Sequence, residues 1–166
     1  MVRIAVARAL GENTSNSSDI TSPLSTFLID RCPAVKNEAI ISLSNLGSMS
    51  QPALSLIVQE LANSDAGIRA NAAAAVGNIG DGDTSLEIVD PLTVLLTDED
   101  IYVRIKAAIA LIQIQLTIQP SQQEILDSAV DELFLALQND DHDVRLTAIK
   151  GLRRKELSTD PVTIDH

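Results

Sequence analysis

Pairs of Asp and Arg are the most repeated polar feature of this chain. An Asp stands four residues before an Arg in Asp65/Arg69, Asp100/Arg104 and Asp141/Arg145. A guanidinium can bridge oxygen acceptors through parallel N–H donors, and an Asp before a helix can accept from its free N–H groups. The pairs could anchor a ligand, but their recurrence favours a structural ladder that caps helices and cross-links turns. Where Cys32 precedes Lys36, we expect a weaker pair.

Candidates for catalysis are sparse. Cys32 is the only cysteine, Pro33 follows it, and no His lies near it in the sequence, which favours a packing role over a nucleophile. The two imidazoles, His142 and His166, have no second His at helical spacing. We therefore expect no catalytic residues, and the sequence favours a non-enzyme without excluding an enzyme.

Acidic clusters lie at 81–83, 98–100 and 140–143, where a metal would be conceivable. A calcium loop needs alternating oxygen ligands closed by a Glu near its twelfth position, and counting from Asp81 that position is Leu92. We expect these carboxylates to be solvated or to cap helices. No metal and no cofactor is predicted.

The elements that position these residues recur along the chain. A cation preceded by Val or Ile stands at Arg3, Lys36, Arg69, Arg104 and Arg145, at intervals of 33, 33, 35 and 41 residues. Apolar residues three, four and seven positions after each cation form the buried stripe of one helix, and leucines or isoleucines eight and twelve positions before it mark a second helix. A period of this length indicates stacked helix pairs. The predicted fold class is all-α, a right-handed α-solenoid of about four and a half pairs.

The repeats fall into one domain, residues 1–157, followed by a tail at 158–166. Their expected bounds are 1–13, 23–48, 51–81, 85–118 and 121–157. Pro23, Pro52 and Pro91 are expected in or near the first turns of the outer helices, where a missing N–H costs nothing. For Pro91 a second possibility is that residues 85–90 form an extra turn before it. The polar stretch 13–19 is expected to be a long link, and the extra length around 115–123 predicts a bend.

Two strings carry a resemblance to a known family. "IRANAAAAVGNIGDGD" and "VRIAVARALGEN" resemble the inner helix of HEAT repeats, most closely the short subtype named for phycobilisome bilin lyases. The resemblance implies an α-α superhelix with inner helices on the concave side and a ladder of Asp and Arg from successive repeats. Because the chain starts inside an inner helix, either it is part of a longer solenoid or this half-repeat packs against something, which includes self-association.

The charge and aromatic content of the chain limit the classes of partner that it is expected to bind. The net charge is −11, from 23 acidic and 12 basic residues, and aromatic residues make up 2% of the chain. An acidic surface repels phosphate backbones, and few aromatic rings are present to stack on bases, so no nucleic acid is expected. No apolar run is long enough for a membrane helix, and neither a signal peptide nor a disulfide pair is present. A cytoplasmic location is expected.

The concave face remains as the candidate binding surface. Positions two, five and nine after each central cation should point away from the outer helices and combine carboxamides with small or aliphatic side chains. The leading hypothesis is a non-enzymatic scaffold that binds a protein or peptide there. The alternative is a bilin lyase subunit or another phycobilisome-related protein that handles a chromophore or a biliprotein, and a third possibility is the sensing arm of a larger regulatory protein. The predicted face consists of Glu38, Ile41, Asn45, Asn71, Ala74, Asn78, Lys106, Ile109 and Gln113.

Overall fold

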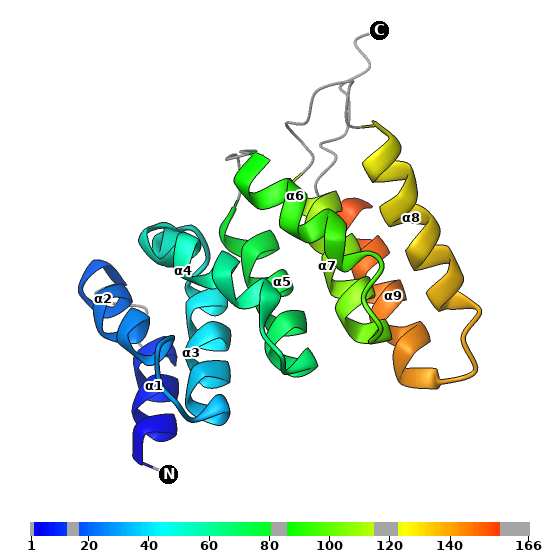
Figure 1. Ribbon diagram of the computed structural model, residues 1–166. Helices are drawn as coiled ribbons and strands as arrows, with labels where there is room; N and C mark the ends of the chain where they lie inside the picture. Colours follow the sequence, from blue (N-terminus) through cyan, green and yellow to red (C-terminus); the bar gives the residue numbers. More distant parts are fainter. Residues whose placement is uncertain (1, 13–16, 81–85, 115–122, 157–166) are drawn as a thin grey trace, which may run out of the picture.

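The described residues form helices joined by short turns in two layers (Figure 1). The structure is a computed structural model that describes residues 2–12, 17–80, 86–114 and 123–156. In chain order the elements are α1 (Val2–Glu12), α2 (Ser17–Phe27), α3 (Pro33–Leu46), the 3₁₀ helix η2 (Gly47–Ala53), α4 (Leu54–Gln59), the 3₁₀ helix η3 (Glu60–Ala62), α5 (Ala66–Ile79), α6 (Leu86–Leu95), α7 (Ile101–Ile114), α8 (Gln123–Leu137) and α9 (His142–Glu156).

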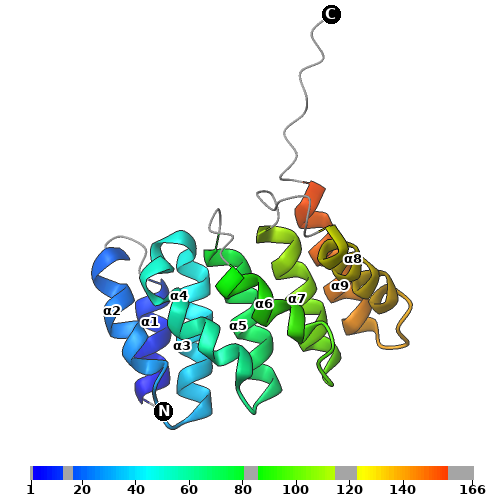
Figure 2. The ribbon, with the colours of Figure 1, turned by 45° about the horizontal axis from the view of Figure 1, so that its top comes forward.

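Helices α1, α3, α5, α7 and α9 form the inner layer, and α2, α4, α6 and α8 form the outer layer (Figure 2). From α1 to α7, each inner helix packs mainly on the next inner helix. Each outer helix packs on the inner helix that follows it in the chain. The predicted all-α solenoid of stacked helix pairs is confirmed.

The core is aliphatic, and the predicted stripe of the central inner helices is buried. Ile40, Ala73 and Ala108, each four positions after its cation, are 0% exposed. Small residues let neighbouring helices approach closely: a Cβ on Gly77 of α5 would lie 2.8 Å from the Cα of Ala110 in α7. A side chain at Gly77 would therefore push α5 and α7 apart.

Three inner helices, α5, α7 and α9, begin at Asp caps. The Oδ1 atom of Asp65 accepts from the backbone N–H of Ile68 at 3.1 Å, and that of Asp100 accepts from Tyr102 at 2.8 Å. Asp141 Oδ1 accepts from the N–H of residue 143 at 2.8 Å. Each carboxylate satisfies an N–H that the first helical turn leaves without a partner.

The prolines correct one sequence prediction. Pro23 lies inside α2 instead of in its first turn, and Ser17–Asp19 belong to α2 instead of to a link. Pro91 lies inside α6, which begins at Leu86, so the alternative of an extra turn before this proline is the one observed. Ile20 and Ile88, before the prolines, are 6% and 4% exposed. Burial of these side chains extends each helix upstream although proline removes one backbone hydrogen bond. The rest of the expected link at 13–16, the insertion at 115–122 and the tail at 157–166 lie outside the described residues.

The C-terminal pair packs differently from the others. Helix α7 makes more extensive contact with the outer helix α8 than with the inner helix α9. Gly151 of α9 lies where an added Cβ would collide with the side chain of Ile109 in α7. The last inner helix therefore does not repeat the inner-to-inner packing of α3, α5 and α7.

Candidate functional site

The inner-helix face is the surface of α3, α5 and α7 that carries the predicted binding residues. Ile41 is 36% exposed and Asn45 is also exposed, whereas Asn71, Ala74 and Asn78 are half-buried. Glu38, Lys106 and Gln113 are half-buried as well. Solvent therefore reaches this face, most fully along α3.

Polar contacts between neighbouring inner helices hold the carboxamides in place. Asn71 Nδ2 donates to Asn37 Oδ1 at 2.7 Å, and Asn78 Nδ2 donates to Ser44 Oγ at 2.8 Å. Each bond joins α5 to α3. A carboxamide has two N–H donors and one acceptor oxygen, so the bond to Asn37 orients the Asn71 side chain and uses one of its donors. The face carries oriented polar groups.

A charge pair stands at the N-terminal end of the face. Arg8 of α1 donates to both carboxylate oxygens of Glu38, Nε to Oε1 at 2.8 Å and Nη2 to Oε2 at 3.0 Å. The hydrogen bond from Arg8 is the main reason that the pKa of Glu38 is lowered, and the same bond raises the pKa of Arg8. Glu38 is thus a paired anion instead of a lone acidic contact.

Ile109 corrects the predicted face at its C-terminal end. It is only 9% exposed, because α9 lies against α7 and Gly151 faces the Ile109 side chain. The aliphatic surface that solvent reaches on the inner-helix face is therefore carried by Ile41 and, in part, by Ala74.

Four of the repeated cations, each in the first turn of an inner helix, bridge successive repeats. Their carboxylate partners come from the following repeat and are not the Asp residues four positions upstream. The pairs are Arg3 Nε–Asp30 Oδ2 at 3.0 Å, Lys36 Nζ–Glu60 Oε1 at 2.7 Å, Arg69 Nε–Asp98 Oδ2 at 2.8 Å and Arg104 Nε–Glu132 Oε1 at 2.8 Å. We call this row the ladder.

Arg69 shows how fully one ladder cation is used. Its Nε and Nη2 atoms donate to the two carboxylate oxygens of Asp98, both at 2.8 Å, and Nη1 donates to the carbonyl oxygens of Asn63 and Ser64 at 2.9 and 3.1 Å. The hydrogen bond from Arg69 lowers the pKa of Asp98 and raises the pKa of Arg69. With all these partners in place, this cation is structural.

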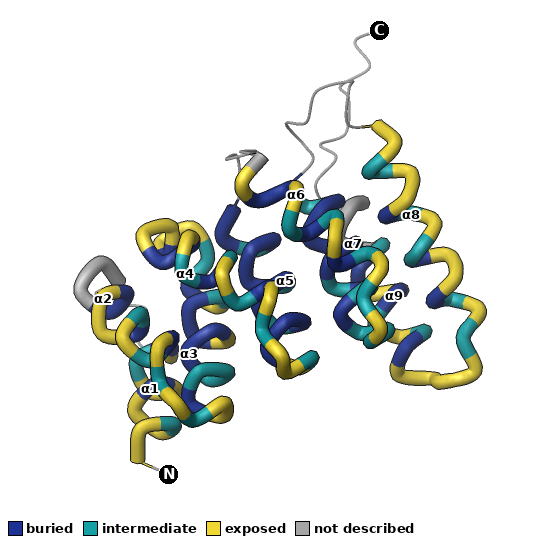
Figure 3. Tube along the Cα trace, in the orientation of Figure 1, coloured by how far each residue is buried: buried dark blue, intermediate teal, exposed yellow. Residues whose placement is uncertain are grey.

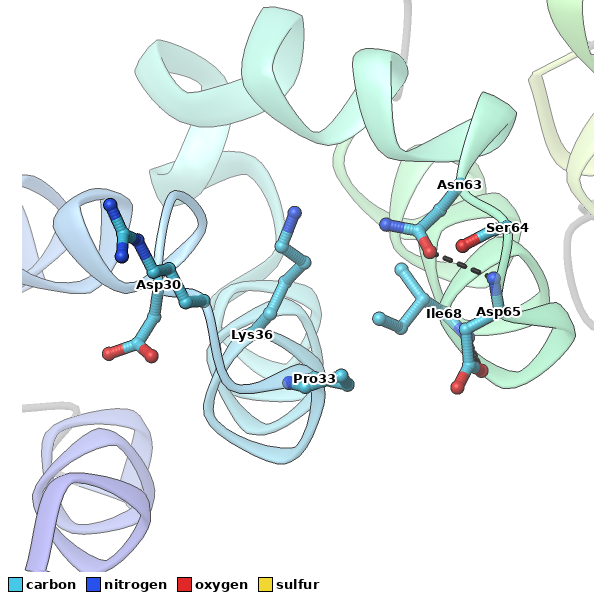
Figure 4. Close-up of a pocket in the computed structure, with 8 residues that line it drawn as sticks. Asp30, Pro33, Lys36, Asn63, Ser64, Asp65 and Ile68 are labelled. Carbon is cyan, nitrogen blue, oxygen red and sulfur yellow. Dashed lines mark hydrogen bonds between the residues drawn. The ribbon is translucent and has the colours of Figure 1, made fainter.

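A pocket of about 540 Å³ opens between two neighbouring turns (Figure 4). Asp30, Arg31 and Pro33 line one side, and Asn63, Ser64 and Asp65 line the other, with Lys36 and Ile68 between them. Its main charged groups have partners within the fold: Asp30 pairs with Arg3, Lys36 pairs with Glu60, and Asp65 caps α5. The pocket is a gap between adjacent ladder turns.

The structure does not gather the catalytic candidates. Cys32 is half-buried at the N-terminus of α3, and His142 is exposed with its Nδ1 atom 3.5 Å from Asp143 Oδ1. Within the described ranges, no three His, Cys, Asp or Glu side chains are placed to hold a metal ion. His166 and residues 81–83 lie outside those ranges. Of the helices that the structure describes, none is long and apolar enough to cross a membrane.

Asn37 and Ser44, the partners of the two carboxamides, were not among the residues predicted from the sequence. Each precedes its partner by 34 residues, about one repeat. Polar residues one repeat apart on the same face were the signal that could have found them.

The stacked layers and the ladder between repeats define an all-α repeat protein. Residues 54–132 match the family model described as HEAT repeats. The description names no subtype, so it does not extend to bilin lyases. No curated protein matches the sequence.

Solved structures support the same class. One engineered protein is 26% identical over 90% of this chain and 71% of its own, with a TM-score of 0.63. A second is 25% identical over 94% and 75%, with a TM-score of 0.66. A designed armadillo repeat protein in complex with the peptide (KR)4 is 20% identical over 89% and 72%, with a TM-score of 0.59, a likeness of fold alone. The chain has the fold of a HEAT- or armadillo-like solenoid.

Proposed function

We propose that this protein is a non-enzymatic scaffold that binds a protein or peptide partner along the inner-helix face. The observation that carries the proposal is the pair of oriented carboxamides, Asn71 and Asn78, beside the accessible aliphatic residues Ile41 and Ala74. The remaining hydrogen-bonding capacity of Asn71 suits the N–H and C=O groups of an extended backbone. The aliphatic residues supply apolar contact between these polar points.

The charge of the chain favours a partner with basic residues. A net charge of −11 attracts a cationic partner and raises its rate of encounter. Peptide binding is compatible with this fold, because the designed armadillo repeat protein was solved in complex with (KR)4. The bilin-handling alternative has no such support and stays a prediction, and so does the cytoplasmic location.

Affinity capture from the source cell's lysate with matched variants tests the proposal. Ile41→Arg/Ala74→Arg adds two cations to the inner-helix face, and Val94→Arg/Leu135→Arg adds the same charge on the outer helices at side chains that are 70% and 63% exposed. We expect a partner that the wild type and the outer variant retain and the inner variant loses, with all three equally helical by circular dichroism. A partner that the inner variant retains and the outer variant loses would contradict the proposal.

A further inference from the structure

The C-terminal pair carries an apolar surface at the end of the stack. We call it the end face; it consists of Val130, Phe134 and Leu137 on α8 and Leu146, Ile149 and Leu152 on α9. On each helix the three residues follow helical spacing and form one stripe. Phe134, Leu146 and Ile149 are 54%, 37% and 43% exposed. Figure 3 shows α5 largely dark blue, whereas α8 and the turn after it carry long yellow stretches.

In the described repeats, the position four residues after the cation is buried wherever another repeat follows, at Ala7, Ile40, Ala73 and Ala108. The position one residue after the cation is buried in α5 and α7 and half-buried in α1 and α3. Leu146 and Ile149 stand one and four positions after the cation Arg145. Ile105 and Ala108, at these positions in α7, are both 0% exposed. A solenoid end that faces water normally carries polar residues. This end instead keeps the apolar side chains of a surface on which another repeat stacks.

Arg145 donates hydrogen bonds to backbone carbonyl oxygens of its own turn, as Arg69 does, but it lacks a carboxylate partner among the described side chains. Its Nη1 atom donates to the carbonyl oxygens of Asn139 and Asp140 at 2.7 and 2.8 Å, as Arg69 Nη1 does in its own turn. Among the residues whose side chains the structure describes, no carboxylate pairs with Arg145. The end face therefore complements an apolar partner that also brings an anion.

We propose that the end face binds an amphipathic helix pair of another protein, stacked as the next repeat. A carboxylate near the end of its first helix would pair with Arg145 as Glu60 pairs with Lys36. A second copy fits less well. Its α1 exposes Val2 and Val6, but the charged side chains beside them, Arg3 and Arg8, are cations, whereas Arg145 needs an anion.

The chain's own central repeat provides a probe of the right chemistry. A fluorescent peptide of residues 51–80 contains the sequences of α4 and α5 and the ladder carboxylate Glu60. Titration of the full chain against this peptide, followed by anisotropy, should give saturable binding. Leu146→Glu/Ile149→Glu should weaken the binding by about tenfold or more, because it places charge on the apolar stripe. Val94→Glu/Leu135→Glu, with the same charge change on the outer surface, should leave it unchanged.

Two further comparisons sharpen the test. A Glu60→Gln peptide, or Arg145→Ala in the chain, should weaken binding by about fivefold or more, with no additional loss when the two are combined. Ile41→Arg/Ala74→Arg should not alter peptide binding, which separates this proposal from the one for the inner-helix face.

Three outcomes would overturn the proposal. The first is no saturable binding, and the second is equal loss of binding in the end-face and outer-surface variants. The third is a dimer of the chain alone that disappears in Leu146→Glu/Ile149→Glu, measured by sedimentation velocity, because it would assign the end face to a second copy.

Discussion

Helices α7 and α9 place apolar residues one and four positions after their cations, yet these residues are buried in α7 and partly exposed in α9. Ile105 of α7 is 0% exposed, and Leu146 of α9, at the same position, is 37% exposed. Both helices have the same spacing of apolar residues, so this spacing alone does not determine which of the residues are buried. In a solenoid the neighbouring repeat decides it.

The ladder shows the same contrast in its charges. Arg69 holds a bidentate pair with Asp98 of the next repeat, and the side chains are only 11% and 10% exposed. Arg145 keeps the bonds to its own turn and has no such partner among the side chains that the structure describes. The ladder is therefore an interaction between repeats, and its last cation marks where the described stack ends.

The largest expected contrast compares two truncations at one repeat position. Ile105→Ala should lower the free energy of unfolding by about 2–5 kcal/mol, because it leaves a cavity in a fully buried site. Leu146→Ala should lower it by less than about 1 kcal/mol, because its side chain is already partly solvated. Urea denaturation measures both. Equal losses of unfolding free energy in the two variants would mean that the Leu146 side chain on α9 is covered in solution.

The next contrast removes two ladder cations. Arg69→Ala leaves Asp98 without its bidentate partner and should cost about 1.5–3 kcal/mol. Arg145→Ala loses only bonds to carbonyl oxygens and should cost about 0.5–1.5 kcal/mol. Urea midpoints and slopes for the two variants measure the difference. A larger loss for Arg145→Ala would reveal a partner for that cation.

Overpacking tests the closeness of the central helices. Ala73 is 0% exposed, and Ala73→Leu should cost about 1–3 kcal/mol by forcing the stack apart. Ala74 is half-buried on the inner-helix face, and Ala74→Leu should change the stability by no more than about 0.5 kcal/mol. Thermal unfolding of both variants checks the pair. An unchanged melting temperature for Ala73→Leu would place the buried face elsewhere.

The smallest effect is a dependence on pH. Arg69 holds the pKa of Asp98 below its ordinary value, so the folded protein binds this proton less readily than the unfolded chain. The contribution of the pair is complete above the unfolded pKa of about 4 and is lost as the pH falls through the folded value. Asp98→Asn should be less stable than the wild type at pH 7, with a gap that narrows below about pH 4. A constant gap from pH 7 to pH 3 would contradict this assignment.

The features that could be predicted from the sequence are those that recur at regular spacing along the chain, namely the helix pairs and their buried positions. The cation spacing and the apolar stripes indicated the helix pairs and the buried positions, such as Ala73, because helical burial repeats along the chain. The ladder carboxylates could not be found this way. Asp98 precedes the next cation by six residues, whereas Glu132 precedes it by thirteen.

Predictions that depended on packing between repeats were less accurate. Ile109 occupies a position that faces outward in α3 and α5, and it is buried because the last pair packs in a different way. The helix around Pro23 begins earlier than the proline suggested, because the upstream Ile20 reaches the core. Neither effect leaves a periodic signal in the sequence.

Site-specific photo-crosslinking can show directly whether a partner binds the inner-helix face. A photoreactive phenylalanine analogue replaces Ile41, Val94 or Ile149, one on each of the inner-helix face, the outer layer and the end face. Each protein is irradiated with the captured partner at the same concentration, and the crosslinked fraction is quantified by mass spectrometry. We expect a large crosslinked fraction from residue 41 and only background crosslinking from residue 94. Crosslinking from residue 149 would report a separate partner of the end face. A partner that crosslinks from residue 94 and not from residue 41 would contradict binding at the inner-helix face.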